Sequence, residues 1–190
     1  MRIRPFAALR PRLDMVEKVS APPYDVVSVE EAIKLAKDNP YSLLHVSRPE
    51  IDFPPGTNPY DDVVYDKAAE NFSKLIKEGV LIREKDECFY LYMQAISGHS
   101  QSGIVACCNI EDYEKNLIRR HEKTRLDKEN DRTRHVLTLK ANTGPVFLMY
   151  RDHVRINEFM EIIKEKEKPI YDFVDSDGVR HSCLLYTSPS

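Results

Sequence analysis

Two hairpin signals constrain the fold of this chain more than any other feature of its sequence. Asp177-Gly178 separates two apolar runs, and this dipeptide is favoured in two-residue β-turns because both positions tolerate positive φ. Upstream, the apolar runs 88–95 and 104–110 flank the polar segment 97–103, which is a second strand–loop–strand pattern. Both patterns predict neighbouring antiparallel strands, so we expect a sheet that contains hairpins.

Helical spacing of apolar residues predicts several helices around these hairpins. Residues 61–78 give the clearest pattern, because apolar side chains recur every three or four positions and Gly79 supplies a C-terminal stop. Ser28 and Glu31 have the spacing of a capping box, which predicts a helix that ends near Asn39-Pro40. Further helices are predicted over residues 127–140 and 156–166.

Short strands complete the expected architecture. They are predicted near the N-terminus and over residues 41–46 and 146–150. His45, a lone histidine near the end of the 41–46 run, is expected to form structural hydrogen bonds rather than to act as a catalyst. Because strands and helices alternate irregularly and include hairpins, the predicted fold class is α+β, with a mixed or antiparallel sheet and flanking helices.

Composition narrows the classes of function. The chain has 190 residues, of which 42% are hydrophobic and 31% charged, and its net charge is −3. This balance fits one globular domain and lacks the basic footprint of a nucleic-acid-binding protein. The longest apolar runs fall far short of the ~20 residues that cross a bilayer, and the N-terminus shows no signal-peptide pattern. We therefore expect a cytoplasmic protein without a membrane or nucleic-acid partner.

The spacing of the cysteines and glycines argues against metal sites and against the common glycine-rich nucleotide-binding motifs. The four cysteines show no CxxC spacing, so buried reduced thiols are expected and no metal site is predicted. The six glycines form neither a GxGxxG fingerprint nor a P-loop.

The densest group of ionisable side chains lies between Arg119 and His135. It contains seven Arg or Lys, four Asp or Glu, two His and two Thr. Mixed charges at helical spacing usually form a solvated face held by weak ion pairs. However, Arg132, His135, Val136 and Leu139 follow i, i+3, i+4, i+7, which predicts one shared inward stripe. A charged group beside apolar surface needs a carboxylate or an anion as partner, so this pattern favours a site.

Several short strings together resemble a known family. They are Pro5-Phe6, Ala21-Pro22-Pro23-Tyr24-Asp25-Val26, Asn39-Pro40, His45, Arg120-His121-Glu122-Lys123-Thr124, Asp131-Arg132 and Asn142-Thr143-Gly144-Pro145. In combination they are similar to the domain of unknown function 1015 family over roughly residues 1–181. The resemblance also implies membership of the ParB/sulfiredoxin-like superfamily, a small α+β fold that includes nucleotide-using ParB domains, sulfiredoxins and free-serine kinases.

The end of the chain departs from this resemblance. Members of the family are longer and carry an Asp-Gly-His-His-Arg-type motif downstream, which is absent here. Residues 182–190 do not continue the pattern expected after the Asp177-Gly178 turn. We therefore expect a single α+β domain over residues 1–181, an N-terminal fragment of a longer protein, followed by a non-native tail over 182–190.

The resemblance implies a function for the charged segment. A nucleotide-dependent phosphotransferase similar to the free-serine kinases would use ADP or ATP with Mg²⁺, and would need cations for the phosphates and a base for the hydroxyl nucleophile. The predicted phosphate-binding residues are Arg120, Lys123, Thr124, Arg132 and His135. The predicted catalytic residues are Glu122, His121 and Asp25.

Two other interpretations remain open at this point. A nucleotide-binding regulatory module of the ParB-like type would use the same Arg and His residues without turnover. A structural fragment with a salt-bridged surface would bind no small-molecule nucleotide or phosphate at all. The sequence leaves open whether the protein is an enzyme.

Overall fold

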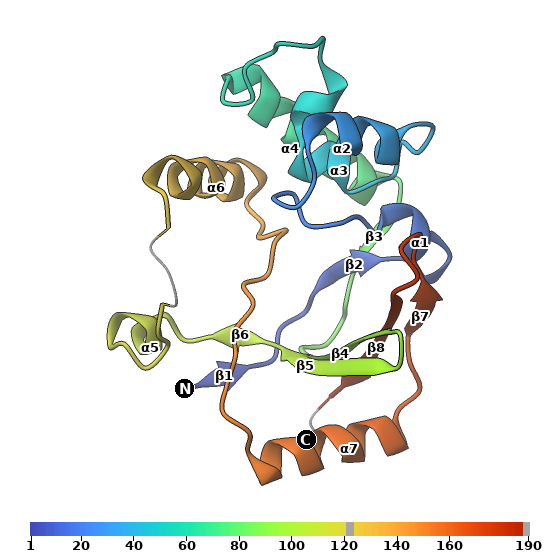
Figure 1. Cartoon of the computed structure of the whole chain (residues 1–190), viewed down its shortest axis with the longest axis vertical. Helices are drawn as coiled ribbons and strands as arrows, with labels where there is room; N and C mark the ends of the chain where they lie inside the picture. Colours follow the sequence, from blue (N-terminus) through green and yellow to red (C-terminus); the bar gives the residue numbers. More distant parts are fainter. Residues whose placement is uncertain (121–123, 188–190) are drawn as a thin grey trace. The chain divides into compact units, whose positions relative to one another are not determined.

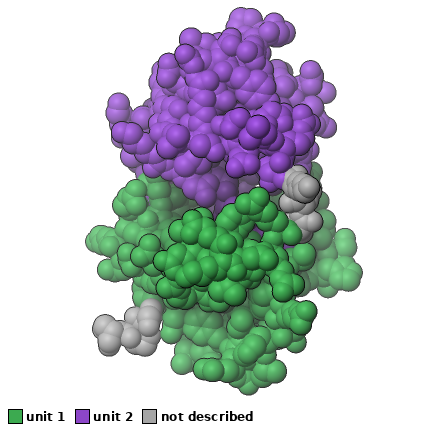
Figure 2. Space-filling model, turned by 90° about the vertical axis from the view of Figure 1, so that its left-hand side faces the viewer, with its two compact units in different colours: residues 1–13, 83–121, 148–190 green, residues 14–82, 122–147 purple. Residues whose placement is uncertain are grey.

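The computed structural model describes residues 1–120 and 124–187. Its mixture of helices and antiparallel sheets confirms the predicted α+β class (Figure 1). The chain forms two compact units, coloured separately in Figure 2, where the sequence predicts a single domain. Unit 1 comprises residues 1–13, 83–121 and 148–190, and unit 2 comprises residues 14–82 and 122–147.

Unit 1 is built on a four-stranded antiparallel sheet with strand order β5-β4-β8-β7. The predicted hairpins are both present. The first joins β4 (Phe89–Ile96) to β5 (His99–Val105) through Ser97 and Gly98, which both have positive φ, 50° and 82°. Such a two-residue turn matches the twist of the strands, so most of the predicted polar loop is itself part of β5. The second hairpin joins β7 (Tyr171–Val174) to β8 (Arg180–Tyr186).

The main core of unit 1 lies between this sheet and α7 (Val154–Lys166), which Figure 1 shows beside the sheet. Met160 and Ile163 of α7 pack against Leu91 and Leu184 from the two central strands. Residues 182–186, which the sequence assigns to a non-native tail, form most of β8 and pair with β4. The buried Leu184 shows that this strand contributes directly to the core.

The remaining strands of unit 1 are short. β2 covers Leu9–Pro11, and β1 (Ile3–Arg4) pairs with β6 (Cys107–Cys108), which leads into the short helix α5 (Ile110–Glu114). All four cysteines are free thiols. The expectation of buried thiols is confirmed for Cys88 and Cys183 and is wrong for the pair in β6, which is exposed. A two-residue strand that pairs only with another two-residue strand buries little surface.

Unit 2 is helical. Its elements are α1 (Val16–Val19), α2 (Val29–Ala36), α3 (Leu44–Ser47), the 3₁₀ helix η2 (Pro49–Asp52), α4 (Asp62–Lys77) and α6 (Leu126–Leu139). The 3₁₀ turn η1 (Leu13–Met15) and the strand β3 (Leu81–Arg83) span its borders with unit 1. The α4 stripe predicted from the sequence is buried at Val64, Ala68, Phe72 and Leu75. The Ser28–Glu31 capping box is also confirmed, with both reciprocal hydrogen bonds present.

The predicted strand over residues 41–46 is wrong, because the second half of this run belongs to the helix α3. The Oγ atom of Ser42 accepts a hydrogen bond from the backbone N–H of Leu44, 3.3 Å away, at the start of the helical turn. Leu44 then packs against Ala32 and Ala36 of α2. A short apolar run fits a buried strand and a buried helical turn equally well, so its pattern alone does not decide between them.

The predicted strand over residues 146–150 is also wrong. The segment has no regular secondary structure and pairs with no strand of the described residues, and Val146, Phe147 and Met149 are 79%, 71% and 83% exposed. A strand requires a neighbour to accept its backbone hydrogen bonds, and Pro145 also lacks a donor.

Within the described residues, the helices are too short or too polar to span a membrane.

Candidate functional site

A buried carboxylate, Asp131, organises the inner face of α6. The hydroxyl of Tyr65, in α4, donates to Asp131 Oδ1 over 2.6 Å. Arg132 Nε and Nη2 donate to Asp131 Oδ2 over 3.0 and 2.7 Å. Burial, reinforced by Asp131, raises the pKa of Tyr65, so this hydroxyl keeps its proton and acts as a donor.

The inward stripe of α6 therefore differs in phase from the predicted one. Its buried residues are Asp131, His135 and Leu139, spaced i, i+4, i+8. Arg132 lies at the edge of the stripe, and Val136 is 38% exposed, so the prediction that Val136 faces the core is wrong. The physical reason is that Tyr65 offers a hydroxyl donor on α4, which selects a carboxylate as its partner on α6.

Arg132 also contacts the proline-rich segment near the N-terminus. Its guanidinium carbon lies 4.1 Å from the ring centroid of Tyr24. The carbonyl oxygen of Tyr24 accepts a hydrogen bond from Arg48 Nη1 over 2.9 Å, which anchors the segment to the end of α3. Two of the strings that carry the family resemblance, one containing Tyr24 and the other Asp131-Arg132, are thus in contact although 108 positions separate Tyr24 from Arg132.

The guanidinium of Arg134, two positions further along α6, has different partners. It stacks over Tyr65 at 4.1 Å and forms an ion pair with Asp62, while its Nη1 donates to the carbonyl oxygen of Tyr60 over 3.1 Å. This arginine fastens α6 to the start of α4 and is a structural counterpart to Arg132.

His135 is 2% exposed and joins α6 to α3. Its Nε2 lies 2.8 Å from the carbonyl oxygen of Val46, so this nitrogen carries the hydrogen and donates it. Burial lowers the pKa of His135, which favours the neutral ring. A neutral, buried imidazole does not favour direct contact with a phosphate, and the phosphate-binding role of His135 stays a prediction.

The other predicted site residues are dispersed or lie outside the described part of the chain. Asp25 is exposed and forms no ion pair with any described residue. Arg120 belongs to unit 1, where its guanidinium stacks on Tyr113 at 4.7 Å, and Thr124 is exposed. His121, Glu122 and Lys123 lie outside the described residues, so their predicted catalytic and phosphate-binding roles stay predictions.

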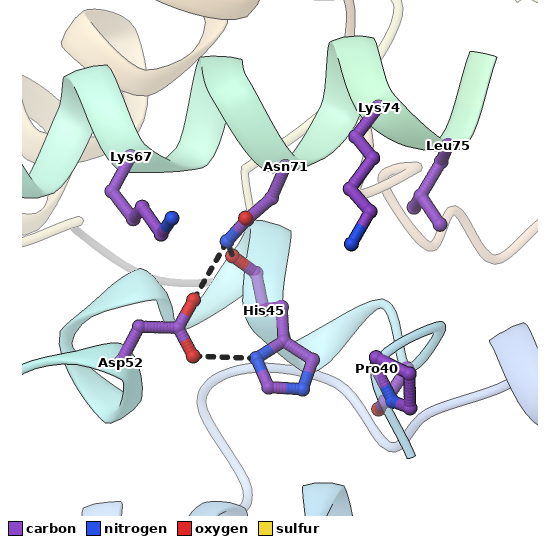
Figure 3. A pocket seen from close by; sticks show the side chains of 8 residues that line it. Pro40, His45, Asp52, Lys67, Asn71, Lys74 and Leu75 are labelled. Atoms are coloured by element: carbon purple, nitrogen blue, oxygen red, sulfur yellow. Dashed lines mark hydrogen bonds and ion pairs between the residues drawn. The ribbon is translucent and has the colours of Figure 1, made fainter. Parts of the chain in front are cut away.

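A second polar group surrounds a hollow of about 320 Å³ elsewhere in unit 2, which we call the His45 hollow. Its walls come from the Pro40–His45 segment, from η2 and from α4. Asn71, in α4, donates to Asp52 Oδ2 over 2.7 Å and to the carbonyl oxygen of His45 over 2.8 Å. Figure 3 shows these bonds, with Lys67 and Lys74 reaching from α4 toward the hollow.

His45 is held in its charged form. Its Nδ1 lies 2.6 Å from Asp52 Oδ1, and its Nε2 lies 3.2 Å from the carbonyl oxygen of Asn39. Because both partners are acceptors, only the doubly protonated ring satisfies both. The hydrogen bond to Asp52 accordingly raises the pKa of His45. Burial acts to raise the pKa of Asp52, but hydrogen bonds from His45 and Asn71 outweigh it and the pKa is lowered.

The sequence patterns did not predict the His45 hollow. They indicated only structural hydrogen bonds for His45. One signal was available, because Lys67, Asn71 and Lys74 follow i, i+4, i+7 and therefore share one face of α4. Among the described residues, no group of three His, Cys, Asp or Glu side chains has an arrangement that would hold a metal ion.

The comparisons with known proteins identify a family. The sequence model of the family described as "Protein of unknown function (DUF1015)" matches residues 3–190. No curated protein and no solved structure matches the chain.

Proposed function

The chain belongs to the DUF1015 family, and we propose that its unit 2 binds the phosphate groups of a nucleotide, ADP or ATP with Mg²⁺, beside Arg132 and Tyr24. One observation carries the proposal: the Arg132 guanidinium stacks on Tyr24 at 4.1 Å, which joins two of the strings by which the chain resembles its family.

The hydrogen bonding of Arg132 supports a role in anion binding. Asp131 occupies Nε and one edge of Nη2, and no described residue accepts from Nη1. The side chain is 29% exposed. The guanidinium is therefore fixed in orientation by Asp131 and Tyr24 while one of its donor edges stays free. A pre-oriented arginine with a free edge suits phosphate oxygens, because little side-chain entropy is lost on binding.

The reaction that fits this arrangement is transfer of the terminal phosphoryl group to a hydroxyl, as in the free-serine kinases that the ParB/sulfiredoxin-like superfamily includes. Asp25 follows Tyr24 directly, and its exposed carboxylate would accept the hydroxyl proton or hold Mg²⁺. The free cysteines fit the reducing cytoplasm, the compartment that we propose for the protein.

A regulatory module of the ParB-like type is the second candidate. Asp131 neutralises Arg132 and joins it to Tyr65, so a ligand on Arg132 would be linked to both α4 and α6. Such a link suits a nucleotide switch. Turnover of ATP with a hydroxyl substrate would support the phosphotransferase, whereas binding without turnover would support the module.

Calorimetry with ADP and ATP in the presence of Mg²⁺ tests the proposal. Arg132→Ala removes a charge-assisted contact and is expected to weaken binding by ~1.5–3 kcal/mol, or roughly tenfold to a hundredfold. Arg134→Ala is the matched control, because this arginine lies in the same helix as Arg132 and also stacks on a tyrosine, Tyr65 of α4. Its Nη1 and Nη2 atoms, however, both donate to residues at or just before the start of α4. Equal binding by wild type and Arg132→Ala, or no binding by wild type, would contradict the proposal.

A further inference from the structure

We propose that the His45 hollow is a second anion site, separate from Arg132, that takes a small phosphomonoester. Its charged lining residues are three cationic side chains, His45, Lys67 and Lys74, and one carboxylate, Asp52. The proposal does not depend on nucleotide binding beside Arg132.

The single carboxylate is already committed within the protein. Asp52 Oδ1 lies 2.6 Å from His45 Nδ1, and Asp52 Oδ2 accepts from Asn71. Its side chain is 18% exposed. Asp52 is therefore hydrogen-bonded to His45 and Asn71 and forms no ion pair with either lysine, although the charge of Lys67 helps to lower the pKa of Asp52.

The lysines supply the direct contacts for a ligand. Lys74 forms no ion pair with a described residue, and Lys67 pairs only with the solvent-exposed Glu70, three positions along the same helix, at 2.9 Å. Exposed pairs of this kind are weak and leave two of the three ammonium hydrogens free. Figure 3 shows both lysine side chains on the side of α4 that faces His45 and Asp52.

Ser42 adds a hydroxyl to the lining of the hollow. The residue is 3% exposed, and its Oγ accepts from the backbone N–H of Leu44. The hydroxyl hydrogen meets no acceptor among the described residues and is available to a ligand oxygen.

The geometry selects the class of ligand. Ammonium groups act as compact point charges and suit a doubly charged, near-spherical phosphate better than a planar carboxylate, which arginine pairs with in two parallel bonds. A volume of about 320 Å³ accommodates a phosphate with a few carbon atoms. A small phosphomonoester fits both the charge and the size.

Inorganic phosphate and glycerol 3-phosphate are suitable probes, with binding followed at each residue by NMR. We expect saturable shifts at Ser42, His45 and Asn71 in wild type. The double variant Lys67→Gln/Lys74→Gln is expected to weaken binding by about tenfold or more, since it removes two charge-assisted contacts. Lys77→Gln, in the last turn of the same helix and outside the lining, is the control and should bind as wild type.

Arg132→Ala should leave both probes bound at this hollow, which separates this site from the proposed nucleotide site. Because the two lysines are not part of the core, the double variant should unfold at the wild-type temperature. Equal affinity in wild type and the folded double variant would overturn the proposal. Absence of saturable shifts in wild type would do the same and would show that the His45–Asp52–Asn71 bonds only fasten α4 to the neighbouring turns.

Discussion

His45 and His135 lie in the same helical unit, yet their surroundings favour opposite charge states. His135 meets a single acceptor, the carbonyl oxygen of Val46, and is almost completely buried, which lowers its pKa and favours the neutral ring. His45 meets a carboxylate and a carbonyl oxygen and is held as a cation. The difference comes from the deeper burial of His135 and from the carboxylate of Asp52 beside His45.

The same contrast extends to the regions around the two rings. Along α6, the buried Asp131 pairs with Arg132, and the exposed Asp62 pairs with Arg134. In the His45 hollow, the one carboxylate is occupied and two lysines remain. An anion beside α6 would therefore meet the unoccupied Nη1 of an arginine whose charge is balanced, whereas an anion in the hollow would meet two ammonium groups that form no ion pair with the lining carboxylate.

The largest expected effect concerns the balanced network on α6. Asp131→Ala would leave the buried Tyr65 hydroxyl and the half-buried Arg132 without their shared acceptor, so we expect the free energy of unfolding to fall by about 3 kcal/mol. Denaturant unfolding measures the change. Asp127→Ala is the control, because its pair with Arg125 is exposed and should contribute little. A similarly small effect for Asp131→Ala would show that the network is a surface feature.

A smaller effect is expected on the pH dependence of stability, where His45 and His135 should contribute with opposite sign. A raised pKa in the folded state stabilises the fold fully below the unfolded value of about 6.5, and this contribution is lost as pH rises through the folded value. His45→Gln should therefore cost more stability at about pH 6 than at about pH 9. His135 affects stability in the opposite way. Its pKa is lowered in the folded state, so the unfolded chain binds a proton more tightly and the fold loses stability as pH falls.

Unfolding curves of wild type and His45→Gln at both pH values provide the measurement. The difference between the two proteins isolates His45 from other titrating groups. A difference that does not change with pH would mean that His45 is not held as a cation, and the charge excess assigned to the hollow would be wrong.

Local signals predicted the parts of the fold that local residues determine. The Ser28–Glu31 capping box, the α4 stripe with Gly79 after it and the Asp177-Gly178 turn all depend on neighbours within a few positions. The runs 41–46 and 146–150 were predicted wrongly, because short apolar segments fit either state until a partner is known.

The candidate sites depend on partners far apart in the sequence. Tyr65 sets the phase of α6 from 66 positions away, and Asn71 reaches Asp52 from another element. Sequence spacing placed Arg132 and His135 on the inward side of α6 but did not reveal that Asp131 is the carboxylate that joins Arg132 to Tyr65. The contact of Tyr24 with Arg132 joins residues 108 positions apart, which no local spacing determines.

A titration of isotope-labelled protein with ADP and Mg²⁺, followed residue by residue by NMR, tests the central claim most directly. We predict that the largest saturable shifts occur at Tyr24, Asp131 and Arg132 in wild type and disappear in Arg132→Ala, while Ser42 and Lys74 respond less. Saturable shifts that avoid these three residues, or that persist unchanged in Arg132→Ala, would contradict the assignment of the nucleotide site to the contact between α6 and the Tyr24 segment.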